Sequence, residues 1–243
     1  MELSHVLERM TRRFRRRAPF DESDCQALQA LPFKKRVAEA GRYLVREGDR
    51  MQESVLLLSG LAYRHKMTAD GARQIVSIHI PGDFLDLEGA LLKVADHSIQ
   101  TLTRAEVATV GREHIVALID SHPRVGRAMW IDTLVDGSIF REWVMNVGRR
   151  PARQRIGHLL CEFARRLEIT GLGDTSGYEF PMTQEQLADA TGLTSVHVNR
   201  TLKVLEAEGL IVRSKRFIKI PDWERLRDMS GFNELYLHLD QAA

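Results

Sequence analysis

The sequence predicts an α+β protein, in which a sandwich or roll of short strands precedes a long helix, two short helices and a hairpin. Three observations carry this prediction. Closely spaced apolar runs punctuated by glycine fill residues 37–111, and a long helical pattern fills residues 124–147. Two short helical patterns joined by a glycine turn lie within residues 182–220. At 243 residues, the chain is long enough to bury a core in each of two domains.

Composition excludes several classes of protein. The chain is 44% hydrophobic and 28% charged, as soluble globular proteins are, and no run approaches the roughly 18 apolar residues of a membrane span. The arginines of residues 12–17 are not followed by the apolar core of a secretory signal. Cys25 and Cys161 are too few and too far apart for a disulfide framework. We therefore expect a cytoplasmic protein without a membrane partner.

The strands of residues 37–111 predict a sandwich or roll rather than βαβ units, because no glycine-rich phosphate loop or long helical pattern separates them. Ala69-Asp70-Gly71 lies between strands expected at 62–67 and 74–80, and Asp-Gly supports the positive φ of a tight hairpin turn. One face of the second strand carries aliphatic residues and is expected to be buried: Val76, Ile78 and Ile80.

A helix of about 24 residues is expected over 124–147, after a shorter helix that stops at His122-Pro123. Its apolar surface is too broad for packing on one side only. The helix is therefore buried against a partner, forms an irregular dimer seam, or lies buried within one chain. For the dimer seam we assign four residues: Val125, Met129, Ile139 and Trp143. Gly148 marks a domain boundary, which gives segments 1–122, 123–148 and 149–243.

Two short helices joined by a glycine turn follow this boundary. Thr183 opens the first helix with a capping box. Gly192 lies in the turn, and Thr194 or Ser195 caps the second helix, which Gly209 ends. This order predicts a helix-turn-helix.

A hairpin with a basic tip follows, since Arg213 to Arg216 lie between two apolar runs, and a hairpin in this place is a wing. The basic character extends further, because residues 149–220 hold 12 lysines and arginines against 8 acidic residues. Such a block alone describes a solvated face, but together with a helix-turn-helix it indicates a polyanionic partner.

The second helix, residues 195–208, separates an apolar face from a polar one when its residues are placed at 100° intervals. Arg200 lies near the middle of the polar face and can pair with guanine, Asn199 can pair with adenine, and Val196 can contact a thymine methyl. We therefore predict that this helix enters the major groove of DNA. The predicted DNA-binding residues are Thr183, Gln184, Thr194, Ser195, Val196, His197, Asn199, Arg200, Lys203 and Lys215.

These motifs resemble the winged helix-turn-helix of the Crp–Fnr family of bacterial regulators. The matching runs are Met182–Ala188, Gly192–Thr194, Asn199–Leu202 and Leu205–Ile211. Gly41, Gly48-Asp49, Gly60 and Pro81-Gly82-Asp83-Phe84 are similar to the glycine-marked roll of cyclic-nucleotide-binding domains. The resemblance covers about residues 35–220. It implies a double-stranded, jelly-roll-like sensor, a homodimer through the long helix, a palindromic operator on double-stranded DNA, and RNA polymerase as a partner.

Departures from the family pattern bear on the effector. Family sensors of cyclic AMP carry a Gly-Glu pair after Pro-Gly-Asp-Phe and an Arg-Ser pair later, where this chain has Asp86-Leu87-Glu88 and His97-Ser98. An acidic group without an arginine to pair with it opposes an anionic nucleotide. Two cysteines do not suffice for the family's iron–sulfur cluster, and no spacing among the nine histidines singles out a haem ligand. The predicted effector pocket, with the effector unknown, comprises Asp86, Leu87, Glu88, His97 and Ser98.

No nucleophile–base arrangement, metal-ligand spacing or carboxylate pair indicates a catalytic or metal site. We therefore expect a sequence-specific, DNA-binding transcription regulator that is not an enzyme. The alternatives are a small-molecule-binding roll whose helical C-terminal region binds protein, and a cupin-like enzyme, which the absence of a His/Glu metal set disfavours.

Two weaker features have simpler interpretations. The arginine run of residues 12–17 predicts a solvated helix, with contact to DNA or another subunit as the alternative. Cys25 is interpreted as an inert thiol rather than a redox sensor.

Overall fold

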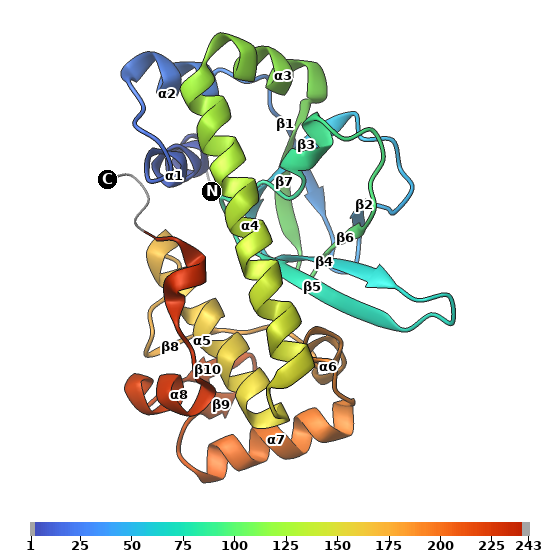
Figure 1. Ribbon diagram of the computed structural model, residues 1–243, viewed down its shortest axis with the longest axis vertical. Coiled ribbons are helices and arrows are strands. Elements are labelled where there is room, and N and C mark those ends of the chain that lie inside the picture. Colours follow the sequence, from blue (N-terminus) through green and yellow to red (C-terminus); the bar gives the residue numbers. More distant parts are fainter. Residues whose placement is uncertain (1–2, 240–243) are drawn as a thin grey trace. The chain divides into compact units, whose positions relative to one another are not determined.

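The computed structural model describes residues 3–239 and divides the chain into two compact units, which share the long helix α4 Pro123–Arg149 (Figure 1). The first unit holds the described residues up to 66, residues 78–138 and the last described residues from 237. The second unit holds residues 67–77 and 139–236. Among the described residues, no helix has the length and apolar character needed to cross a membrane.

Two antiparallel sheets form the predicted roll, which confirms the α+β fold. One sheet has the strand order β1-β7-β3, and the other has the order β2-β6-β4-β5. The strands are β1 Lys34–Ala38, β2 Tyr43–Val45, β3 Glu53–Ser59, β4 Ala62–Met67, β5 Arg73–His79, β6 Ser98–Thr101 and β7 Ala105–Gly111. A 3₁₀ turn, η1 Leu87–Ala90, lies between β5 and β6.

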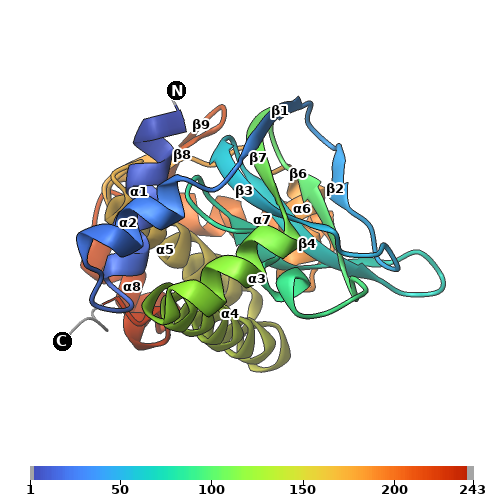
Figure 2. The ribbon, with the colours of Figure 1, turned by 90° about the horizontal axis from the view of Figure 1, so that it is seen from above.

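Strand β3 shows how this unit builds a core on both sides of a sheet. Val55 and Leu57 pack inside the roll, together with Ile99 and Val107. Leu56 and Leu58 point the other way, because successive side chains of a strand alternate, and pack in a second cluster that includes Phe14. Helices on the outer side of this sheet contribute to that cluster (Figure 2): α1 Leu3–Arg15, α2 Glu22–Gln29, α3 Arg112–Ser121 and the first turns of α4.

The hairpin turn between β4 and β5 agrees with its prediction, since Gly71 has a φ of 88°. The predicted burial of one face of β5 is only partly correct. Ile78 is buried as expected, but Ile75 and His79 of the other face are also buried, and Val76 is only half-buried. Both faces of the strand are therefore covered toward its C-terminal end. Buried and exposed side chains do not alternate along it as predicted.

Helix α4 spans Pro123–Arg149 and has 27 residues, slightly more than the predicted 24. Pro123 occupies the first helical position, where a missing N–H has no consequence.

The second unit contains the predicted helix-turn-helix and wing. Its elements after α4 are α5 Ala152–Thr170, β8 Gly177–Glu179, α6 Gln184–Thr191, α7 Ser195–Ala207, β9 Val212–Ser214, β10 Phe217–Lys219, α8 Trp223–Ser230 and η2 Glu234–Leu237. Strands β8, β10 and β9 form a small antiparallel sheet in that order. The capping box of Thr183, the left-handed Gly192 and the cap at Thr194 are all present as predicted.

Candidate nucleic-acid interface and effector site

A buried apolar contact holds the two helices of the helix-turn-helix together. Leu187 and Ala188 of α6 and Val198 and Leu202 of α7 are all buried. Gly192 turns the chain between the helices with a φ of 63°, in the left-handed region that favours glycine. The interface residues on α7 therefore stand on a fixed frame.

The guanidinium of Arg155 fixes the turn to the start of α5. Its Nη1 donates to the carbonyl of Thr191 over 3.0 Å, and its Nε donates to the carbonyl of Arg150 over 2.7 Å. These carbonyls lie at the ends of α6 and α4, where helix geometry leaves backbone acceptors without partners. One side chain therefore satisfies two helix ends, a role that sequence reasoning did not find because the contacts are 5 and 36 residues apart.

The outward face of α7 is open, as the helical projection predicts. Val196 is 81% exposed, Arg200 and Lys203 are exposed, and Asn199 and His197 are half-buried. Ser195 is half-buried at the first turn of the helix.

Two predicted interface residues have structural roles as helix caps. Thr183 Oγ1 accepts from the N–H of Gln186 at 3.1 Å, and Thr194 Oγ1 accepts from the N–H of His197 at 3.2 Å. Each hydroxyl proton remains free to donate to a phosphate, because the cap uses the oxygen as an acceptor only.

The wing is attached to the interface helix through Glu206. Arg213 donates to this carboxylate from its backbone N–H over 3.3 Å and from Nη2 over 2.6 Å, and the bond from the arginine lowers the pKa of Glu206. Arg213 is therefore turned toward α7. The sequence predicted that it would belong to the exposed basic tip, and this part of the prediction is wrong. Lys215 and Arg216 form the exposed tip, and Lys215 has a φ of 53°, which is uncommon outside glycine.

The predicted effector pocket only partly assembles. Glu88 and His97 come together, with 3.7 Å between Glu88 Oε1 and His97 Nε2. Asp86 is instead fully buried and accepts from the N–H of Val55, and Ser98 accepts from the N–H of Glu47. Leu87 lies half-buried in η1.

An arginine that sequence reasoning missed lies at this site. Nη2 of Arg64, on β4, is 2.9 Å from Glu88 Oε1, so the expectation of an acidic group without an arginine is wrong. No local motif could have shown this pair, because the two residues belong to β4 and η1 and meet only when the roll folds. Burial raises the pKa of Asp86 to about 7, so Asp86 is largely protonated below neutral pH, and Glu88 carries the acidic character of the site.

The residues assigned to the dimer seam face the chain's own core. Val125 and Met129 belong to the cluster beneath the β1-β7-β3 sheet, Ile139 is buried, and Trp143 Nε1 donates to both oxygens of the buried Glu162. These four side chains have almost no surface left to offer a partner, so this part of the prediction is corrected. The exposed apolar residues of α4 are Trp130, Leu134, Phe140, Val144 and Met145.

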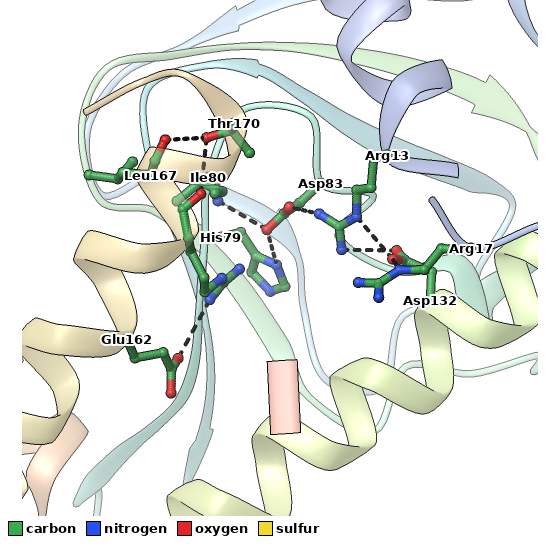
Figure 3. A network of polar contacts seen from close by, with 10 residues as sticks. Arg13, Arg17, His79, Ile80, Asp83, Asp132, Glu162, Leu167 and Thr170 are labelled. Atoms are coloured by element: carbon green, nitrogen blue, oxygen red, sulfur yellow. Dashed lines mark hydrogen bonds and ion pairs between the residues drawn. The ribbon is translucent and has the colours of Figure 1, made fainter. Parts of the chain in front are cut away.

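The arginine run is also not simply solvated. Arg13 makes two hydrogen bonds to Asp132 of α4, at 2.9 and 3.0 Å, and an ion pair with Asp83, which follows β5 (Figure 3). Arg17 also lies 3.5 Å from Asp132. Both aspartates are buried, whereas Arg12, Arg15 and Arg16 are exposed as predicted.

The cysteines are buried free thiols, and burial raises the pKa of Cys161 to about 12, which makes it unreactive at neutral pH. Within residues 3–239, no group of three or more histidines, cysteines or acidic residues could hold a metal ion.

Comparison with known proteins agrees with this architecture. Residues 154–229 match the model of the Crp-like helix-turn-helix domain, and residues 35–122 match the model of the cyclic nucleotide-binding domain. The transcriptional activatory protein AadR of Rhodopseudomonas palustris is 31% identical over 206 residues, which cover 82% of each chain. The transcriptional activator protein FnrL of Cereibacter sphaeroides is 29% identical over 215 residues, which cover 87% of this chain and 86% of FnrL.

A solved structure shows the same fold. FixK2 from Bradyrhizobium japonicum superposes with a TM-score of 0.76 at 23% identity, covering 82% of this chain and 98% of its own. A roll joined by a long helix to a winged helix-turn-helix with an open recognition face defines a DNA-binding transcription regulator. The chain belongs to the Crp–Fnr family.

Proposed function

We propose that this regulator acts as a cytoplasmic homodimer, reads a palindromic operator with α7, and works with RNA polymerase. The observation that carries the proposal is the outward face of α7, where an exposed arginine, lysine and valine stand on a fixed helix-turn-helix frame beside a basic wing tip. A two-fold dimer places one such helix in each half-site, about 34 Å apart. The relatives named as activators support action as a regulator rather than as an enzyme.

Three substitutions separate base reading from phosphate contact. Arg200→Ala is expected to weaken binding by about 1–3 kcal/mol and to relax the preference at one base pair, because arginine pairs bidentately with guanine. Lys203→Ala is expected to weaken binding to all DNA sequences alike. It is also expected to reduce the slope of log K against log salt concentration by about one. Val196→Glu is expected to change the preferred base from thymine to cytosine, whose N4 amino group can donate to the carboxylate.

Selection of sites from a random duplex pool, followed by titration at several salt concentrations, measures these effects. Steep weakening of binding with rising salt is expected for DNA through counterion release, and its absence would favour a protein partner. If Arg200→Ala weakened every sequence equally while Lys203→Ala changed the selected bases, the two assigned roles would be reversed.

We also propose that cyclic AMP is not the effector. Glu88 forms an ion pair with Arg64, and His97 lies beside the same carboxylate. A phosphate that bound Arg64 would therefore have to break this ion pair and approach an acidic group. Calorimetric titration at micromolar concentrations is expected to give no binding isotherm. A one-site isotherm for cyclic AMP would contradict this proposal.

A further inference from the structure

Two side chains from different helices meet at the edge of the recognition face. Asn199 of α7 donates from Nδ2 to Gln184 Oε1 over 3.1 Å, although the residues are 15 positions apart. Gln184 is the first residue of α6 and is exposed, whereas Asn199 is half-buried. The capping box at Thr183 and the buried contact between α6 and α7 hold both backbones in place. The packing of the two helices therefore places Gln184 beside Asn199.

The hydrogen bond leaves Asn199 with a defined remaining capacity. An asparagine amide has two N–H donors and one carbonyl acceptor. Gln184 takes one donor, so one N–H and the Oδ1 oxygen remain. An adenine presents one acceptor, N7, and one donor, the N6 amino group, in the major groove. What remains on Asn199 therefore matches what an adenine offers.

The same bond restrains the rotation of the Asn199 amide. A flip of the Asn199 amide alone would bring Oδ1 against Gln184 Oε1, and two acceptors would oppose each other, so this amide can turn over only together with that of Gln184. A free asparagine would have to lose this rotational freedom on binding DNA, at a cost of about 0.5–1.5 kcal/mol for one side chain, or roughly 2- to 10-fold in affinity. The bond to Gln184 removes that freedom in advance.

We propose that Gln184 is a positioning residue for sequence recognition, whose side-chain carbonyl presents Asn199 to an adenine in each half-site. This inference rests on the proposed function of α7 and names one base that it reads. It also separates Gln184 from the residues that contact DNA directly, since its effect acts through Asn199.

The experiment compares base preference, not only affinity. Duplexes carrying the selected operator, with each of the four bases at each half-site position, are titrated with the full-length protein and its variants. Asn199→Ala is expected to reduce the preference for adenine at one base pair by about fivefold or more. Gln184→Met, which keeps the length but removes the acceptor, is expected to reduce the preference at the same base pair by about 2- to 10-fold.

Two further variants separate positioning from a direct phosphate contact. Gln184→Glu keeps the acceptor and adds a negative charge, so it is expected to lower the affinity for every duplex while keeping the adenine preference. Glu185→Met is a matched control on the next exposed residue and is expected to leave the base preference unchanged. In the Asn199→Ala background, Gln184→Met is expected to have no further effect on that base pair.

Several outcomes would overturn the inference. Equal weakening of all sequences by Gln184→Met would make Gln184 a phosphate contact only. Loss of the adenine preference in Gln184→Glu, or an unchanged preference in Asn199→Ala, would equally contradict it. If the unmodified protein selected no sequence at all, the proposed function itself would fail, which is distinguishable because the other outcomes require a selected operator. Cooperative thermal unfolding of each variant confirms that the fold is retained.

Discussion

The double variant Trp130→Glu/Leu134→Glu is expected to be monomeric and to lose at least about 100-fold in affinity for a palindromic duplex. The two side chains are 69% and 55% exposed in a single chain and, at four residues apart, lie on the same side of α4. Large exposed apolar side chains along one helix mark a surface suited to association, and we place the interface of the proposed homodimer there. Charged side chains in such an interface oppose association. A monomer also loses the 10²- to 10⁴-fold gain in DNA affinity that comes from joining two DNA-binding domains. Light scattering and fluorescence anisotropy with labelled duplex measure the two effects.

Two controls distinguish dissociation from unfolding. Leu235→Glu changes a residue that is 78% exposed outside α4, and it is expected to leave the dimer and its DNA affinity intact. Met129→Glu places charge at a residue that is only 3% exposed, and it is expected to destabilise the fold rather than to give stable monomers. A Trp130/Leu134 variant that remained dimeric would remove this face of α4 as the seam.

Arg13→Ala is expected to lower the free energy of unfolding by about 3–5 kcal/mol, the range for breaking a buried ion pair by removing one partner. Arg13 is the cation between Asp83 and Asp132, and both carboxylates are buried. Arg17, at 3.5 Å from Asp132, does not replace it, because Asp132 would lose the two hydrogen bonds that it accepts from Arg13. Urea unfolding followed by circular dichroism measures the change.

The neighbouring arginine is a matched control for this change. Arg12 is exposed on the same helix, so Arg12→Ala is expected to change the stability by no more than about 0.5 kcal/mol. Arg13→Lys is expected to recover only part of the loss, because an ammonium group cannot make the two parallel bonds of a guanidinium to Asp132. Equal stabilities of the Arg12 and Arg13 variants would show that this ion pair contributes nothing net.

The helix-turn-helix could be predicted from the sequence because its signals are local. The capping box of Thr183, the left-handed Gly192 and the cap of Thr194 each depend on residues within a few positions. The outward position of Arg200 follows from helical periodicity alone, once the apolar face is known. These local features are enough to predict which side of α7 is exposed, and no knowledge of the rest of the fold is needed.

The face of α4 could not be predicted in the same way. Met129 and Trp130 are both large and apolar, and they lie 100° apart on a helix that carries such residues nearly all round. Which of them is buried depends on what packs against the helix, and that contact involves distant segments such as α1. Periodicity therefore gave a broad apolar surface but not the side that stays exposed.

The ion pairs of the roll were unpredictable for a related reason. Arg64 meets Glu88, and Arg13 meets Asp83 and Asp132, through elements that are far apart along the chain. Composition indicates how many charges must be accommodated, but tertiary packing decides which are paired. The misjudged effector site and arginine run both result from this limit.

The position of Arg13 between its two aspartates also constrains the order in which the first unit is completed during synthesis. Its partners lie 70 and 119 residues further along the chain, so α1 leaves the ribosome long before either carboxylate exists to receive it. The bonds from Arg13 to Asp132 can form only after this part of α4 has been made. Contacts of such large sequence separation form late and slowly, because the intervening loop must close first. The ion pairs of Arg13 are therefore among the last contacts of α1 to form.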